Sequence, residues 1–203
     1  MNCYYAVAVT GGIGCGKSSV LEILKNASFE ILDTDKITHQ ILSENLDLKN
    51  KIINKFGEQC LSSKGNVNRK ALGKIIFKSE EKRNVLNSLI HPIVHKKILD
   101  WMTYCKNKNF ITAVEIPLLF ECGWESLSWN CIISIEADSN LVKSRLLQRG
   151  LSKDEIDLRL KAQWPAKLKS DLADISIQNN GTKEDLRKKI QTWIKCLNKE
   201  NAL

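Results

Sequence analysis

The chain opens with an unbroken apolar stretch. Tyr4–Thr10 reads YYAVAVT, and a run of this length predicts a strand buried in a parallel sheet. Between residues 18 and 26 the apolar positions have helical spacing, which predicts a helix with one buried face. A second short strand is predicted over Phe29–Leu32. Strand, loop, helix and strand in this order are typical of the start of an α/β fold with a parallel sheet.

The middle of the chain has a different pattern. Residues 36–106 show periodic apolar positions and no clear strand, and a polar break at Gly57–Asn68 predicts a loop with a short turn. The pattern therefore indicates a helical lobe that is inserted after the second strand.

Strand-like segments resume after the helical lobe. Further strands are predicted over Phe110–Ile116, Cys131–Ile135 and Ile175–Ile177, and further helices over Leu141–Gln148, Lys153–Ala162 and Lys183–Leu197. Thr182 is the expected N-cap of the last helix.

Composition narrows the class of protein. The chain has 203 residues, of which 43% are hydrophobic and 27% charged, as expected for a soluble globular protein. No apolar run is long enough to span a membrane, and no signal peptide is evident. The seven cysteines are odd in number and lack C-x-x-C spacing, which favours reduced thiols in the cytoplasm and argues against zinc.

The net charge of +8 is concentrated late in the chain. Residues 141–203 hold 14 Lys and Arg against 8 Asp and Glu, which accounts for six of the eight net charges. A basic excess favours anionic partners, either phosphorylated small molecules or nucleic acid, although a solvated basic surface explains the charge equally well.

The strongest motif lies directly after the first strand. Residues 11–18 read GGIGCGKS and match G-x-x-x-x-G-K-[ST] in full. Glycines allow the backbone N–H groups to converge on phosphates, and the following helix adds its N-terminal dipole. Lys17 is expected to reach the outer phosphates of ATP, and the hydroxyl of Ser18 is expected to bind Mg²⁺. The predicted ATP-binding residues here are Gly12, Ile13, Gly14, Cys15, Gly16, Lys17, Ser18 and Ser19.

Three acidic residues are candidates for the chemistry. Asp33 and Asp35 follow the second strand, at the strand end where ligands bind to parallel sheets. Either could orient an attacking hydroxyl or hold Mg²⁺ through water, and one could instead cap the next helix. Glu115 ends a buried strand, where it could bind Mg²⁺ or be a buried, paired acid.

Paired basic residues suggest a mobile lid. Arg145 and Arg149 are four residues apart, and Arg159 and Gln163 repeat this spacing on the next predicted helix. Such arginines could neutralise phosphate charge in the transition state, or could belong to a solvated helix surface. Cys15 could be a reactive thiol at a helix N-terminus, but a replacement for a small residue is favoured.

Other nucleotide-binding classes fit less well. No N-K-x-D sequence for reading guanine is present, and a motor or transporter ATPase is usually longer. We therefore expect an α/β, three-layer P-loop kinase fold with a parallel sheet, a helical substrate-binding insertion and a helical lid. The predicted nucleotide-binding core comprises 1–35, 107–141 and 165–203, the helical lobe 36–106, and the lid 142–164.

Five motifs in order resemble the dephospho-CoA kinase family. They are TGGIGCGKSS, ILDTD, LNSLIHP, IPLLFE and ADISIQNNG, and they span residues 4–181. The resemblance implies transfer of a phosphoryl group from ATP to the ribose 3′-hydroxyl of dephospho-CoA, the last step of coenzyme A synthesis. It also implies a helical CoA-binding lobe and Mg²⁺ as cofactor.

The resemblance assigns roles by position. Asp35 matches the catalytic base, and Arg145 matches the lid arginine. Asp33, beside Asp35, is predicted to contact the substrate. The remaining assignments are substrate contacts at His91, Leu118, Leu119 and Glu121, and ATP contacts at Asn179 and Asn180. A lone histidine such as His91 is otherwise most often structural.

The chain departs from the family pattern at a few positions. The lid loop after Arg149 is one residue shorter, Gln178 replaces an Asp, and Ser28 stands where a glycine often ends the helix. The rival functions are a P-loop kinase for another small molecule and a nucleotide-dependent nucleic-acid-binding protein, for which no aromatic-basic motif is present. No nucleic-acid or membrane partner is expected, and the protein should be a monomer or a weak homo-oligomer.

Overall fold

The computed structural model describes residues 4–201, with side chains described up to 197. The chain divides into two compact units, one formed by the described parts of 1–33 and 100–203 and the other by Thr34–Leu99. The second unit thus begins two residues before the predicted start of the helical lobe, residue 36, and ends seven residues before its predicted end, residue 106. The residues expected to form a lid, 142–164, belong to the first unit.

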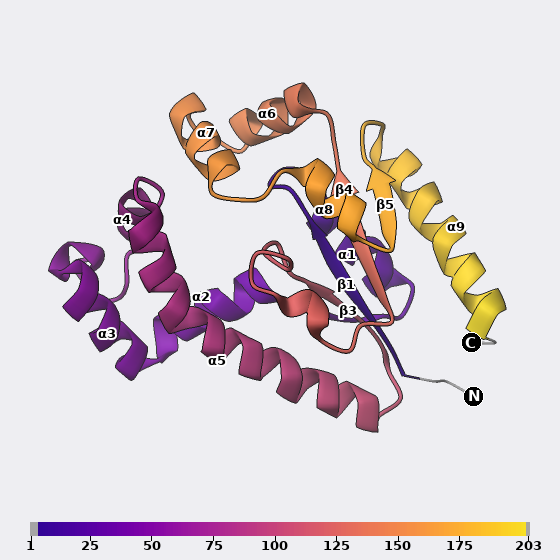
Figure 1. Ribbon diagram of the computed structural model, residues 1–203, viewed down its shortest axis with the longest axis horizontal. Coiled ribbons are helices and arrows are strands. Elements are labelled where there is room, and N and C mark those ends of the chain that lie inside the picture. The colour runs from indigo at the N-terminus through magenta and orange to yellow at the C-terminus, as the bar shows by residue number, and fades with distance from the viewer. Residues whose placement is uncertain (1–3, 202–203) are drawn as a thin grey trace. The chain divides into compact units, whose positions relative to one another are not determined.

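The first unit is built on a parallel sheet, as predicted (Figure 1). Its order is β2-β3-β1-β4-β5, and every neighbouring pair of strands is parallel. The carboxyl ends of all the strands therefore lie at one edge. The strands are β1 (Tyr5–Gly11), β2 (Glu30–Asp33), β3 (Ile111–Glu115), β4 (Cys131–Glu136) and β5 (Ile175–Gln178).

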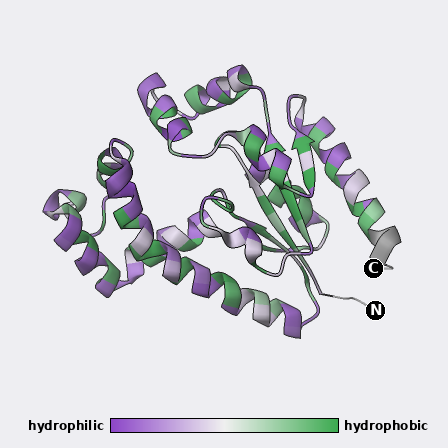
Figure 2. Cartoon of the chain, viewed as in Figure 1, coloured by the Kyte–Doolittle hydropathy of each residue, from purple (hydrophilic) through white to green (hydrophobic). Residues whose placement is uncertain are grey.

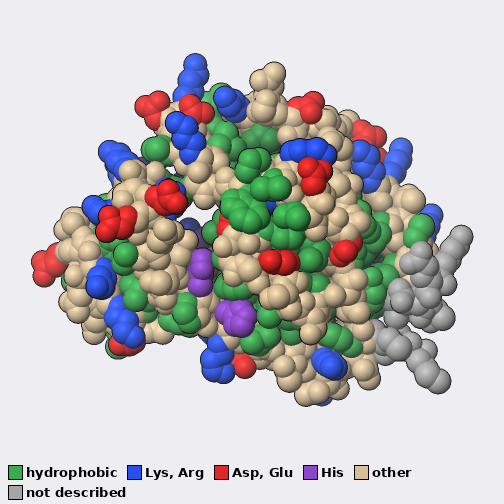
Figure 3. All heavy atoms as spheres, in the orientation of Figure 1, with side chains coloured by type: hydrophobic (Ala, Val, Ile, Leu, Met, Phe, Trp, Pro, Cys, Tyr) green, Lys and Arg blue, Asp and Glu red, His purple; other side chains and the backbone are tan. Residues whose placement is uncertain are grey.

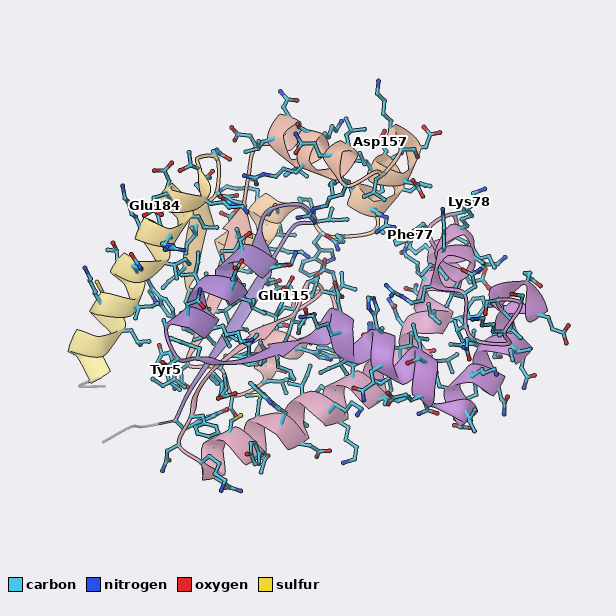
Figure 4. The ribbon with its side chains drawn as sticks, turned by 180° about the vertical axis from the view of Figure 1, so that it is seen from behind. Tyr5, Phe77, Lys78, Glu115, Asp157 and Glu184 are labelled. Atoms are coloured by element: carbon cyan, nitrogen blue, oxygen red, sulfur yellow. The ribbon has the colours of Figure 1, made fainter. Side chains whose placement is uncertain are left out.

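Helices cover both faces of the sheet. Val7 and Ile133 belong to a buried cluster with apolar residues of α1 (Lys17–Asn26) and α9 (Lys183–Asn201). Because side chains alternate along a strand, Ser134 faces the other way, and there its hydroxyl accepts a hydrogen bond from Ser170 of α8 (Ala166–Leu172) at 3.3 Å. Accordingly, α8 lies in front of the sheet in Figure 1, and α1 lies in front in the reverse view of Figure 4. The predicted three layers are thus present.

Two polar helices follow β4. They are α6 (Ser139–Gln148) and α7 (Lys153–Lys161), and a short η2 (Trp124–Ser126) precedes β4. Ser152 and Glu155 form a capping box at the start of α7, since each side chain accepts a hydrogen bond from the other's backbone N–H. Figure 2 shows the contrast between the mainly hydrophobic strands and the largely hydrophilic α7.

The sequence pattern does not predict α8. It has only seven residues, it follows Pro165, and it contains lysines at positions 167 and 169, so no apolar periodicity marks it. Leu168 and Leu172 of this helix are exposed by 42% and 51%, and Trp164, which precedes it, is exposed by 42%. Hydrophobic side chains gather over this region in Figure 3. None of the described helices is both long enough and apolar enough to cross a membrane.

The second unit is helical within Thr34–Leu99. Its helices are α2 (Thr34–Glu44), α3 (Leu46–Phe56), α4 (Arg69–Ile76) and most of α5 (Glu80–Asn107), with a short η1 (Glu58–Cys60) in the predicted loop. The first periodic run is two helices rather than one, because the Asn45 side chain accepts a hydrogen bond from Leu48 N and caps α3. The Asn68 side chain caps α4 in the same way.

A strained serine, Ser28, follows the end of α1. Ser28 has φ +67°, and Phe29 N donates to Leu24 O at 3.1 Å, as in the C-terminal motif that usually places glycine at this position. The left-handed conformation costs a residue with a Cβ atom roughly 1–2 kcal/mol.

We expect Ser28→Gly to stabilise the protein by about 0.5–1 kcal/mol, because glycine adopts this φ without strain but loses more chain entropy on folding. Chemical denaturation measures the change. Asn109, which follows the end of α5, has φ +55° and is the matched position. Asn109→Gly should gain less because asparagine tolerates this conformation. Equal gains at both positions, or none at Ser28, would show that the serine is not strained.

Candidate active site

The loop between β1 and α1 requires glycine at two positions. Gly11 has φ +132°, and a Cβ atom there would lie 2.1 Å from the carbonyl oxygen of Ile135. Gly16 has φ +104°, and a Cβ atom there would lie 2.2 Å from Nδ2 of Asn179. A side chain at either position would displace the neighbouring strands or open the loop. The glycines therefore let the loop curl tightly in the manner expected of a phosphate-binding loop.

Lys17 is held inside this loop. Its side chain is buried, and Nζ donates hydrogen bonds to the carbonyl oxygens of Gly11 at 3.1 Å and Gly12 at 3.0 Å. Both acceptors are neutral carbonyl oxygens, so these two hydrogen bonds hold the ammonium group at the loop without neutralising its charge. The charge can therefore attract phosphate oxygens. Ser18, in the first turn of α1, is exposed, and Ser19 is half-buried.

Arg145 and Asn179 form hydrogen bonds with backbone carbonyl oxygens on the other side of the loop. The Asn179 Nδ2 donates to Cys15 O at 2.7 Å, and the Arg145 guanidinium donates to Asn179 O at 3.0 Å and to Gly14 O at 3.5 Å. Arg149 is exposed at the end of α6. Of the two arginines left open by the sequence, the structure therefore brings Arg145 to the loop.

Asn180 lies next to this network. It is exposed, and its Oδ1 accepts a hydrogen bond from Asp138 N at 2.8 Å, which ties the end of β5 to the turn before α6. Its predicted contact with ATP stays a prediction.

Cys15 is a packed residue. Its side chain is 1% exposed, and burial raises the pKa of its thiol, an effect that the nearby Lys17 charge only partly opposes. A buried thiol with a raised pKa is a poor nucleophile at neutral pH. The structure thus favours the replacement of a small residue over a reactive cysteine. Cys3 lies outside the described residues, and the other six cysteines are free thiols.

A buried ion pair lies beside the loop. Lys169 of α8 is fully buried, and its Nζ lies 2.6 Å from Glu121 Oε1 and donates to Pro117 O at 2.6 Å. The same carboxylate oxygen accepts a hydrogen bond from Trp164 N at 2.9 Å. Burial lowers the pKa of Lys169, and the hydrogen bond and charge of Glu121 oppose that shift.

This pair changes how the IPLLFE motif is interpreted. Glu121 Oε1 is held by Lys169 and Trp164, whereas its buried Oε2 has no hydrogen-bond partner among the described residues. The expected contact of Glu121 with substrate stays a prediction. Leu119 is fully buried and Leu118 half-buried. Sequence reasoning missed Lys169 because lysine is almost never fully buried unless paired, and nothing in the α8 sequence marks its partner.

We expect Lys169→Met to lower the free energy of unfolding by about 3–5 kcal/mol, because it leaves the Glu121 carboxylate unpaired in a buried setting. Differential scanning calorimetry should show a fall in Tm of roughly 10 °C. Lys167→Met, which removes an exposed lysine from the same helix, is the control and should change Tm little. The double variant Glu121→Gln/Lys169→Met should recover much of the loss, and a single variant as stable as wild type would contradict the account.

The three acidic candidates divide between the units. Asp33 ends β2 and Glu115 ends β3, and the two are register partners in the sheet, with Glu115 only 5% exposed (labelled in Figure 4). Asp35 comes two residues after β2, in the first turn of α2, within the helical unit. His91 also belongs to that unit, where it precedes Pro92 in α5, and burial lowers the pKa of its imidazole.

The donor atoms in the first unit suit Mg²⁺. Ser18, Asp33 and Glu115 offer only oxygen atoms, which this hard cation prefers. In the part of the chain that the structure describes, no three His, Cys, Asp or Glu side chains group as a metal cage. Mg²⁺ in kinases is commonly held by one or two protein oxygens together with substrate phosphates, so the residues present fit this arrangement.

Comparison with known proteins gives a consistent result. A family model described as dephospho-CoA kinase matches residues 5–185. A dephospho-CoA kinase of Enterococcus faecalis is 33% identical over 93% of this chain and 94% of its own length, and one of Carboxydothermus hydrogenoformans is 37% identical over 92% and 91%.

A solved structure agrees with these relatives. The dephospho-CoA kinase from Campylobacter jejuni superposes with a TM-score of 0.72 at 35% identity and covers 98% of this chain and 99% of its own. The similarity in sequence and in structure therefore extends over nearly the full length of this chain and of these relatives. On the match of the family model and of these relatives, the chain belongs to the dephospho-CoA kinase family.

Proposed function

We propose that this protein transfers the γ-phosphoryl group of ATP to the ribose 3′-hydroxyl of dephospho-CoA, which yields coenzyme A and ADP. The observation that carries the proposal is the glycine loop with Lys17 buried against it, in a chain that belongs to the dephospho-CoA kinase family. A buried ammonium at such a loop is suited to the charge of ATP phosphates.

Each residue then has a physical role. Lys17 and the N–H groups of the loop bind the phosphates, except the N–H of Ile13, which donates to Gln163 Oε1. Arg145 adds a second positive charge at Gly14. Asp35 orients the ribose hydroxyl and accepts its proton. Because phosphoryl transfer has a loose transition state, positioning and charge neutralisation contribute more than early removal of this proton.

Mg²⁺ would be held by Ser18, with Glu115 binding it directly or through water. When bound, the ion neutralises charge on the β- and γ-phosphates. His91 and Leu118 are proposed contacts for the CoA part of the substrate. A cytoplasmic location and a monomeric or weakly associating protein are proposed from the sequence alone.

A substrate panel tests the proposal. Purified protein with ATP and Mg²⁺ should release ADP with dephospho-CoA and not with adenosine or shikimate. Phosphorylation of either of the latter two, with no reaction of dephospho-CoA, would assign the chain to another small-molecule kinase activity.

A further inference from the structure

Gln163 bridges the end of the α7 segment and the phosphate-binding loop. Its Oε1 accepts a hydrogen bond from Ile13 N at 3.1 Å. A backbone N–H can only donate, so the side-chain atom facing it must be the amide oxygen, and the orientation of the amide is fixed by chemistry. The Nε2 group consequently lies on the other branch of the amide.

This amide nitrogen has two N–H donors available. Among the residues whose side chains the structure describes, 4–197, none forms a hydrogen bond with Gln163 Nε2, and the Gln163 side chain is half-buried. A held amide with open donors is a ready partner for an anionic oxygen, because a hydrogen bond to a charged group is stronger than one between neutral groups.

Gln163 contacts the loop between the residues that Lys17 and Arg145 contact. Lys17 donates to the carbonyl oxygen of Gly12, and Arg145 donates to that of Gly14. Gln163 binds the N–H of Ile13, the residue between these two glycines. The positive charges and the amide therefore converge on three consecutive residues of the loop, where a terminal phosphate would be attracted most strongly.

The buried ion pair fixes where Gln163 lies. The next residue, Trp164, donates its backbone N–H to Glu121, which is paired with buried Lys169. Two residues further, Ala166 packs so closely on the loop that a Cβ atom at Gly12 would lie 3.2 Å from its own Cβ. The backbone on the C-terminal side of Gln163 is therefore anchored to the loop independently of the Gln163 side chain.

We propose that Gln163 is a positioning residue for the γ-phosphoryl group, held by Ile13 through its oxygen and donating to the phosphoryl oxygens through Nε2. The Glu121–Lys169 pair keeps it in place. This inference rests on the proposed use of ATP. It gives Glu121, through Lys169 and Trp164, a role in supporting the ATP side of the reaction.

Equilibrium binding of ATP and of ADP, each without dephospho-CoA, tests this role by isothermal titration calorimetry. Gln163→Ala should weaken ATP binding by about tenfold or more and ADP binding by less than about twofold, since only ATP carries the γ-phosphoryl group. Gln148→Ala, on the exposed end of α6, is the matched control and should leave both affinities unchanged.

Gln163→Glu tests the donor role of Nε2 separately from the acceptor role of Oε1. It keeps an oxygen for Ile13 N–H but replaces the donor with a negative charge, so ATP should bind at least as weakly as to Gln163→Ala. Hydrogen exchange of the Ile13 amide should remain slow in the Glu variant and become faster in the Ala variant. Equal losses of ATP and ADP affinity, or a Glu variant with wild-type ATP affinity, would overturn the proposed donor role.

The same purified proteins distinguish failure of the proposed function from failure of the proposed role of Gln163. Wild-type protein that makes no coenzyme A would refute the proposed function. Wild-type protein that makes coenzyme A, with a Gln163→Ala variant of unchanged ATP and ADP affinity, would refute only the role of Gln163.

Discussion

Replacing Asp35 with asparagine should lower kcat by about 10²-fold or more, the scale that a positioned general base contributes. Asparagine has the same size and can still accept a hydrogen bond, but it cannot take the ribose proton. The KM for both substrates should change less than kcat, because the lost interaction strengthens only as the hydroxyl attacks. Steady-state kinetics with dephospho-CoA and ATP provide the measurement.

Two further variants make this result specific. Asp47, like Asp35, lies in the first turn of a helix of the Thr34–Leu99 unit, and Asp47→Asn should leave kcat unchanged. Asp33→Asn should lower kcat less than Asp35→Asn does. Near-normal turnover of Asp35→Asn together with a severe loss for Asp33→Asn would move the role of base to Asp33.

Lys17→Met should lower kcat/KM for ATP by about 10²–10³-fold, a loss typical of removing one preorganised electrostatic contact to the reacting group. Methionine retains most of the apolar stem in a buried position but lacks the ammonium that donates to Gly11 O and Gly12 O. Initial rates at varied ATP concentration measure the change.

Lys25→Met controls for the loss of one positive charge. Lys25 lies in the last turn of the same helix and is exposed, so its removal should have little effect on rate. If Lys17→Met and Lys25→Met have equal kinetics, the ammonium of Lys17 does not act on the phosphates. Circular dichroism should confirm that both variants are folded.

The pattern of apolar residues predicted the main helices and strands, because these helices bury one face and the central strands are buried on both faces. The five strands are found within a residue or two of the expected positions, since each is a short apolar run in a sheet covered on both faces. Helix ends were less predictable. The break at Asn45 depends on a capping hydrogen bond that competes with an otherwise continuous helical pattern.

The site was predictable where the motif itself fixes geometry. The glycine loop and Lys17 could be predicted from local sequence. The glycines that adopt positive φ, and the lysine that folds back onto the loop, all lie within eight consecutive residues. The contacts of Gln163 with Ile13, and of Lys169 with Glu121, join positions 150 and 48 residues apart. Such pairings depend on how α8 packs against the sheet, which no local pattern in this chain reports.

The most direct test of the account is to measure both products of one reaction. Protein, ATP, Mg²⁺ and dephospho-CoA should yield one ADP for each molecule that gains a phosphate, and phosphorus NMR should locate that phosphate on the ribose 3′-oxygen. Release of ADP without formation of coenzyme A, or a phosphate on another oxygen, would contradict the proposed function.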